Sequence, residues 1–140
     1  MKNNKAGFTI LEIIVMVVVL GVVGAITVPK FKTMLYQSRE GRTKSGLGDL
    51  RGAIAIYYSD NFGIFPSDEG TPDDRLSVVL VPKYLIKIPP VDLPHFHSGK
   101  PRTVQNQIDD QGDWVYTTLD GFVAVNCTHS DTKGAPVSEW

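Results

Sequence analysis

The feature that most constrains this chain is an apolar run near its amino terminus. Residues 8–28, FTILEIIVMVVVLGVVGAITV, contain a single charged side chain, Glu12. A helix of that length covers roughly 31 Å, about one hydrocarbon thickness of a bilayer. Val and Ile dominate the run, but in lipid only a helix satisfies its own backbone over such a length. The run therefore predicts a membrane-spanning helix.

Two general explanations of this run leave something unexplained. A secretory signal peptide would account for the basic start with Lys2 and Lys5, but the apolar part is too long and the small-residue cleavage pattern around Gly24 and Ala25 is poor. A plain membrane anchor does not explain why the apolar run contains the acid Glu12. A carboxylate in a spanning helix costs up to about 2.5–3.5 kcal/mol at mid-bilayer and less near an end, so Glu12 calls for a partner.

The leader that ends in Gly7, followed by Phe8-Thr9-Ile10-Leu11-Glu12 and the apolar run, resembles the amino-terminal signal of type IV pilins and type II secretion pseudopilins. The resemblance implies that a prepilin peptidase cuts after Gly7 and methylates the new amino group of Phe8. It also implies that Glu12 neutralises the amino terminus of a neighbouring subunit. A carboxylate and an ammonium that both lie in lipid gain most by meeting each other.

Gly21 and Pro29 lie where this family has a glycine and a proline. Proline removes a hydrogen bond within a helix, so Pro29 is expected to kink or interrupt the helix. In related filaments the stretch between the two residues loses its helical form on assembly, and the resemblance implies the same here. Both residues are also common in membrane helices in general.

From residue 30 to residue 58 the pattern becomes amphipathic. Leu47, Leu50, Ile54 and Tyr57 fall on one face of a helix. Glu40 and Lys44 are expected to pair across one turn of its polar surface, and Ser59-Asp60-Asn61 with Gly63 predicts the end. We therefore predict one long helix. The predicted domains are a leader (1–7), a transmembrane and filament-core helix (8–29), an amphipathic stem helix (30–58) and a globular head (59–140).

Four glycines weaken the stem helix by up to about 1 kcal/mol each relative to alanine. They are Gly41, Gly46, Gly48 and Gly52. This loss has to be offset by close packing, either against the head or against neighbouring helices.

The head is predicted to be a small antiparallel β-sheet packed on the stem, which makes the chain an α+β protein. Residues 114–118 and 122–126 are strand-like and are joined through Asp120-Gly121, a good hairpin turn. Residues 76–85 predict one or two helical turns. The sequence around Asp60, Asn61 and Pro66, and again near Trp140, resembles that of pseudopilins.

The head departs from the family in two ways. Many pilus-forming pilins close this region with a disulfide, which the lone Cys127 does not allow within one chain. Major pseudopilins often carry an acidic calcium loop, but Asp131 is the only acid here before Glu139, whereas calcium takes roughly six to eight oxygens. We expect no calcium site and no cofactor.

The histidines and the cysteine form two alternating pairs, His95-x-His97 and Cys127-x-His129. Residues two apart face the same way on an extended chain, so the four side chains could converge on one zinc ion. Paired zinc ligands are usually two to four residues apart in the sequence, and this spacing differs. The alternative is a polar loop with incidental histidines and a small buried thiol, and the sequence alone does not favour the metal site.

Composition and motifs exclude several other functions. With 14 Lys and Arg against 15 Asp and Glu, the chain lacks the basic excess of a nucleic-acid-binding protein. It has no Gly-rich phosphate loop, no His-Glu-x-x-His and no Gly-x-Ser-x-Gly, so we expect no enzymatic activity. The acids Asp109, Asp110 and Asp113 are interpreted as a solvated surface beside a strand.

The sequence thus predicts a structural subunit of a type IV-type filament. The resemblance favours a type II secretion pseudopilin, with the main subunit of a surface pilus as the alternative. A second alternative is a membrane-anchored periplasmic binding module that does not polymerise. The expected partners are further copies of the chain, the prepilin peptidase, an inner-membrane assembly platform and the bilayer. The expected location is the bacterial inner membrane, with one span and a periplasmic head, and then a filament in the periplasm or at the cell surface.

Overall fold

The structure is a computed structural model that describes residues 7–67, 76–94, 96–98, 104–105 and 107–140. The chain forms two units, Met1–Leu35 and Tyr36–Trp140, and each is described by itself. The leader residues 1–6, with Lys2 and Lys5, lie outside the described residues.

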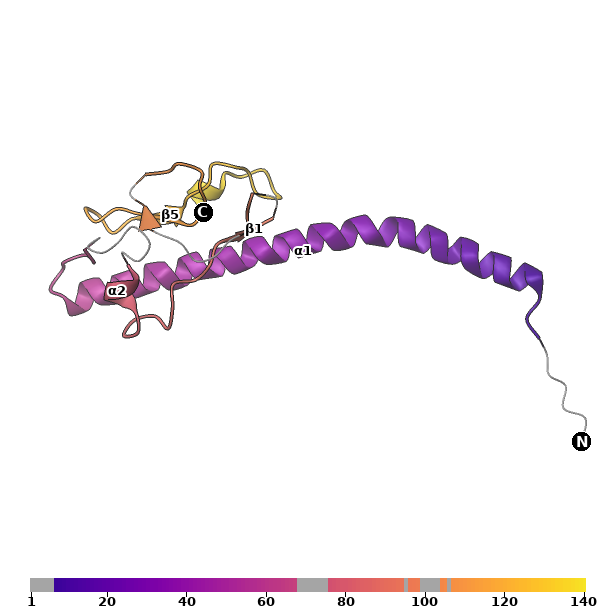
Figure 1. Ribbon diagram of the computed structural model, residues 1–140, viewed down its shortest axis with the longest axis horizontal. Coiled ribbons are helices and arrows are strands. Elements are labelled where there is room, and N and C mark those ends of the chain that lie inside the picture. Colours follow the sequence, from indigo (N-terminus) through magenta and orange to yellow (C-terminus); the bar gives the residue numbers. More distant parts are fainter. Residues whose placement is uncertain (1–6, 68–75, 95, 99–103, 106) are drawn as a thin grey trace, which may run out of the picture. The chain divides into compact units, whose positions relative to one another are not determined.

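The predicted long helix is present as α1, Ile10–Asp60 (Figure 1). It runs through Pro29 without interruption, so the proline does not end the helix. The predicted end is also confirmed. After Asp60, the main-chain N–H (3.0 Å) and the side-chain amide (2.8 Å) of Asn61 both donate to the carbonyl oxygen of Tyr57, in the last turn of the helix.

In the second unit, the predicted face of α1 forms one wall of the hydrophobic core. Leu47, Leu50 and Ile54 are at most 3% exposed, and Tyr57 is partly buried against them. Ala53 joins them on this face, as the 3.6-residue period requires. The opposite face of this part of α1 lies open to solvent.

Short elements that follow α1 complete this unit. They are α2 (Ser77–Leu80), β1 (Asp92–Leu93), β2 (His97–Ser98), β3 (Val104–Gln105), β4 (Trp114–Tyr116), β5 (Val123–Val125) and the 3₁₀ helix η1 (Val137–Glu139). β1 and β2 form an antiparallel pair, and β3, β4 and β5 form a second sheet in that order. The α+β fold is confirmed, but the second sheet is mixed, because β3 runs parallel to β4.

The hairpin between β4 and β5 is confirmed, with Trp114 opposite Val125 and Tyr116 opposite Val123. All six strand residues are buried. In the connecting turn, a carboxylate oxygen of Asp120 accepts the main-chain N–H of Phe122 at 3.0 Å. Such a bond from an aspartate to the backbone two residues on is the local reason why Asp-Gly favours this turn.

Two side chains of α1 and one of β4 form hydrogen bonds with main-chain groups of other segments in this unit. The hydroxyl of Thr43, which is fully buried, donates to the carbonyl oxygen of Asp92 and accepts its N–H, at 3.1 and 3.0 Å. The indole N–H of Trp114 donates to the carbonyl oxygen of Pro89 (2.8 Å), and Arg51 donates to the main-chain oxygen of Val123 (3.1 Å). Buried main-chain groups of the head are therefore satisfied from α1 and β4.

The predicted pair between Glu40 and Lys44 is wrong. Glu40 is buried, and its carboxylate accepts the N–H and the hydroxyl of Thr132 at 2.8 and 2.7 Å. Lys44 instead forms an ion pair with Asp131 at 3.3 Å and lies over the ring of Trp140. The residues around 131 cover this stretch of α1, so both side chains find partners there rather than across one turn of the helix.

Candidate functional site

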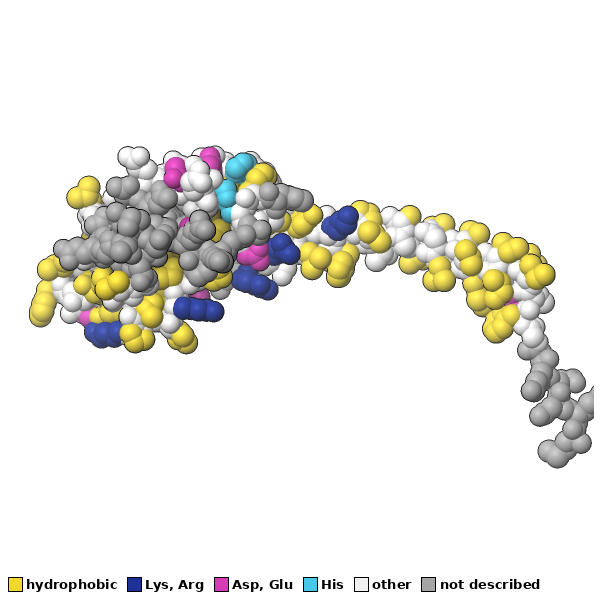
Figure 2. Space-filling view, in the orientation of Figure 1, with side chains coloured by type: hydrophobic (Ala, Val, Ile, Leu, Met, Phe, Trp, Pro, Cys, Tyr) yellow, Lys and Arg dark blue, Asp and Glu magenta, His cyan; other side chains and the backbone are white. Residues whose placement is uncertain are grey.

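In the first unit, the helix presents its apolar side chains to the outside. Within residues 8–28, 15 large apolar side chains are exposed, from Phe8 at 69% and Ile10 at 82% to Val28 at 58%. Figure 2 shows hydrophobic side chains along the visible face of this part of α1. Among the described residues, α1 is the one helix that is long and apolar enough to cross a membrane.

This exposure is too large to persist in water. Burying one apolar side chain of this size is favourable by about 1.5–3 kcal/mol, so burying all 15 would be favourable by about 20–45 kcal/mol. The whole stability of a typical domain is about 5–15 kcal/mol. The segment therefore requires a lipid or protein environment that covers it on all sides.

Thr9 caps the start of α1, a role that the sequence interpretation missed. Its hydroxyl accepts the main-chain N–H of Glu12 at 3.2 Å. This is the threonine half of a capping box, in which Thr and Glu are three residues apart. The pattern Thr9-x-x-Glu12 could have revealed it. A carboxylate in the first turn also interacts favourably with the helix dipole.

The side chain of Glu12 is exposed and, within the part of the chain that the structure describes, it has no ion-pair partner. The helix fixes where Glu12 lies in the first turn of α1 but provides no cation to neutralise its carboxylate. Gly7 and Phe8 precede the first helical residue and are exposed. Gly21 and Pro29 both lie inside the helix, so residues 21–29 are helical in this structure. The roles of these residues in processing and assembly stay predictions.

The second unit contains a cluster of four side chains with metal-ligating atoms. They are His97, Asp110, Cys127 and His129, and one ligand atom of each lies within 4.8 Å of the others. His97 comes from β2, Asp110 from the loop before β4, and the other two from the segment after β5. Three segments that are separate in the sequence therefore meet at one point.

The closest contacts in the cluster involve His129. Its Nδ1 lies 3.3 Å from the sulfur of Cys127 and 3.9 Å from a carboxylate oxygen of Asp110. Its ring stacks on Phe96, with ring centroids 3.9 Å apart. Cys127 is fully buried, whereas the side chains of Asp110 and His129 are 40% and 41% exposed. The cluster thus has a buried sulfur and an open side.

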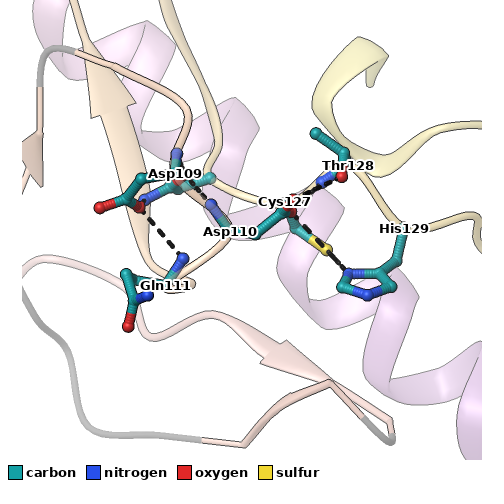
Figure 3. Close-up of polar contacts among 7 residues, drawn as sticks. Asp109, Asp110, Gln111, Cys127, Thr128 and His129 are labelled. Carbon is teal, nitrogen blue, oxygen red and sulfur yellow. Dashed lines mark hydrogen bonds and ion pairs between the residues drawn. The ribbon is translucent and has the colours of Figure 1, made fainter.

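A network of hydrogen bonds positions Asp110 (Figure 3). Its two carboxylate oxygens accept the N–H and the hydroxyl of Thr128, at 2.5 and 2.6 Å. The fully buried Asn126 accepts the N–H of both Asp109 and Asp110 and donates to the carboxylate of Asp109 at 2.6 Å. Asp109 is exposed and the side chain of Asp110 is 40% exposed, in keeping with the interpretation as surface acids. That interpretation missed a second role, because the hydrogen bonds of both acids also organise this loop.

Gly112 allows the loop to approach His97. A Cβ at this position would lie 2.9 Å from Cγ of His97, and the glycine has a φ of +87°. Any other residue would be strained and would collide with the imidazole. Nε2 of His97 is buried and makes no hydrogen bond within the part of the chain that the structure describes.

The environment sets the protonation of these groups. Burial lowers the pKa of the His97 imidazole, and the nearby His129 acts in the same direction while Asp110 opposes it. Burial raises the pKa of the Cys127 thiol. Hydrogen bonds from the side chain and main chain of Thr128 lower the pKa of Asp110. At neutral pH the site therefore holds a neutral His97, a thiol and a carboxylate.

The structure brings together three members of the quartet that the sequence suggested, namely His97, Cys127 and His129. The fourth, His95, lies outside the described residues. Asp110 takes part in the cluster instead, and no spacing rule pointed to it. Its place depends on how the loop folds on Asn126.

The fold and the N-terminal segment define a class of protein: a small α+β head on a helix whose first part needs a lipid or protein environment. The comparisons with known proteins agree with the predicted resemblance. The chain is 32% identical over 68 residues to the type II secretion system core protein G of Pseudomonas aeruginosa, which is 49% of this chain and 47% of that protein.

Two fimbrial proteins also match part of this chain at a comparable identity. The chain is 29% identical over 68 residues to the fimbrial protein EcpC of Eikenella corrodens, which is 49% of this chain and 44% of that protein. It is 33% identical over 54 residues to the type IV major fimbrial protein FimA of Dichelobacter nodosus, 39% of this chain and 35% of that protein. The chain thus matches less than half the length of these relatives. No family model and no solved structure matches.

Proposed function

We propose that this chain is a structural subunit of a type IV-type filament that assembles through the first part of α1. The observation that carries the proposal is the exposed apolar helix of residues 8–28 with its single acid, Glu12, five residues after Gly7. The similar proteins, which are fimbrial proteins and a type II secretion protein, support the same class.

In this proposal a prepilin peptidase removes residues 1–7 and methylates Phe8. The precursor sits in the inner membrane with Lys2 and Lys5 on the cytoplasmic side and the head outside, in keeping with the positive-inside rule. An assembly platform then transfers the helix from lipid into a polymer, where apolar side chains of neighbouring copies replace acyl chains. Head-to-tail contacts of this kind need not close, so they generate filaments.

Glu12 sets the register between copies by pairing with the amino group of Phe8 in a neighbour. Its carboxylate has no ion-pair partner among the described residues, and burying it unpaired between apolar helices costs several kcal/mol. A copy whose Phe8 amino group reaches this carboxylate removes that cost for both charges.

The open face of the stem supports contacts between copies as well. Among the described residues, a Cβ added at Gly41, Gly48 or Gly52 would meet nothing within 4 Å, so no packing within this part of the chain requires these glycines. They leave room for a neighbouring helix to approach closely, and that packing would offset the stability they forfeit.

Among filament subunits, we favour a type II secretion pseudopilin that supports protein export. Cys127 is free and buried, so no disulfide closes the carboxy-terminal region as it does in many pilus-forming pilins. The alternative is the major subunit of a surface pilus for adhesion or motility. Deleting the gene should stop protein export in the first case and remove surface pili in the second.

The decisive experiment combines the intact mass with the variant Glu12→Val in the native membrane. We expect the chain to lack Met1–Gly7 and to carry one methyl group. We expect Glu12→Val to be processed but to form no filaments under the electron microscope. Glu139→Gln, which removes an exposed acid of the same type from η1, is the matched control and should assemble normally.

Three results would refute the proposal. An unprocessed chain would indicate an ordinary anchor, and a cut near Ala25 would indicate an exported soluble head. Normal filaments from Glu12→Val would show that the acid does not set the register. A membrane-anchored receptor that does not polymerise would be insensitive to this substitution.

A further inference from the structure

We propose that His97, Asp110, Cys127 and His129 bind one Zn²⁺ ion. The inference is independent of the filament proposal, because all four residues belong to the second unit. The site would take the ion as a structural element, since four protein ligands leave no open position for a substrate.

The distances in the cluster are close to those of a tetrahedral zinc site. Zinc–ligand bonds of about 2.0–2.3 Å place neighbouring ligand atoms about 3.3–3.8 Å apart. In the structure, the separations are 3.3 Å between Cys127 and His129 and 3.9 Å between His129 and Asp110. The ligand atoms that lie farthest apart, at up to 4.8 Å, need to approach by only about 1 Å.

The donor set selects zinc over calcium or magnesium. One sulfur and two imidazole nitrogens suit zinc, whereas calcium and magnesium prefer oxygen. With Cys127 as a thiolate, Asp110 as a carboxylate and both histidines neutral, the ligands carry two negative charges. These charges balance the ion, so its partial burial leaves no net charge in the head.

Two further observations indicate a ligand. Nε2 of His97 is buried and makes no hydrogen bond among the described residues, which is costly for a polar atom. The hydrogen bonds of Thr128 to Asp110 and the stacking of Phe96 on His129 hold two ligands in place from behind. Outer contacts of this kind orient the ligands in metal sites.

Zinc would connect three segments of the head, two of which the hydrogen bonds of Asn126 and Thr128 already join. These are β2 with His97, the loop with Asp110, and the segment after β5 with Cys127 and His129. Binding would displace the proton of the Cys127 thiol, so it would release about one proton per ion at neutral pH.

The test uses the full chain in detergent, stripped with a chelator and titrated with ZnCl₂. We expect one zinc per chain by mass spectrometry, and a thiolate-to-metal charge-transfer band when Co²⁺ replaces Zn²⁺. His129→Ala and Asp110→Asn should each weaken zinc binding by at least about tenfold, because even the loss of an outer contact costs about 10–100-fold. The side chain of His129 is 41% exposed, so His129→Ala is expected to fold, and the melting temperature measured in chelator verifies this.

The matched controls are His95→Ala and Asp49→Asn, which remove the same residue types outside the four ligands. Both should keep one zinc with unchanged affinity. The proposal is overturned if the full chain binds no zinc, if the Co²⁺ form lacks the charge-transfer band, or if His129→Ala and Asp110→Asn bind as tightly as the unmodified chain. Loss of zinc in His95→Ala but not in Asp110→Asn would likewise overturn the assignment of Asp110.

Discussion

Two glycines that lie two residues apart, on different faces of α1, should respond in opposite ways when each is replaced by alanine. A Cβ at Gly46 would lie 2.9 Å from Cβ and 3.3 Å from Cγ of Pro89, while a Cβ at Gly48 would meet nothing within 4 Å in the part of the chain that the structure describes. The ordinary contact distance begins at 3.4 Å, so Gly46→Ala forces Pro89 away from α1. The ring of Pro89 cannot rotate aside as a flexible side chain would.

The magnitudes follow from these contacts. Each substitution gains about 1 kcal/mol of helix propensity. Gly46→Ala also incurs the cost of overpacking, about 1–3 kcal/mol, so its free energy of unfolding should fall by up to about 2 kcal/mol. Gly48→Ala should raise the free energy of unfolding by about 0.5–1 kcal/mol.

Urea unfolding of each full-length variant in the same detergent, followed by Trp fluorescence, measures both values. Trp114 is buried and lies next to this contact, so it reports on the loss of the core. A shift of the same sign and size for both variants would refute the packing argument. In filament assays Gly48→Ala should assemble less well than the unmodified chain despite its greater stability, if a neighbouring helix uses this face.

Two further predictions concern the head. Tyr116→Phe removes the buried hydroxyl that donates to the carbonyl oxygen of Pro66 at 2.8 Å, and we expect a loss of about 1–2 kcal/mol in urea unfolding because that oxygen is left without its partner; an unchanged midpoint would contradict this. Hydrogen bonds from Lys83 and Tyr84 lower the pKa of Asp60, and hydrogen bonds to Tyr84 and Asp60 raise the pKa of Lys83. The stabilisation that Asp60 contributes is therefore present above pH 3.8 and is lost as the pH falls through its lower folded pKa. The stabilisation that Lys83 contributes is present below pH 10.5 and is lost as the pH rises through its higher folded pKa. Melting temperatures measured across pH should change less at both extremes in Asp60→Asn, by a small amount since the pair is exposed; curves that superimpose on those of the unmodified chain would refute the role of this pair.

Local patterns allowed the helix and the hairpin to be predicted from the sequence. The apolar run of residues 8–28 and the 3.6-residue spacing of Leu47, Leu50 and Ile54 depend only on neighbours along the chain, and α1 has the predicted face and end. The same holds for Asp120-Gly121, whose turn is stabilised by a bond within the turn itself. The Gly7–Glu12 motif is local too.

The tertiary structure decided which distant side chains meet. Glu40 has Lys44 one turn away, yet it bonds Thr132, 92 residues on, because the carboxy-terminal segment covers that part of α1. Asp110 joins His97 and His129 only through the loop that Asn126 organises and the close approach at Gly112. Periodicity specifies which face of an element is buried. The register between segments depends on packing and on buried hydrogen bonds across the whole head, and for this reason the metal-ligand cluster was only partly predictable.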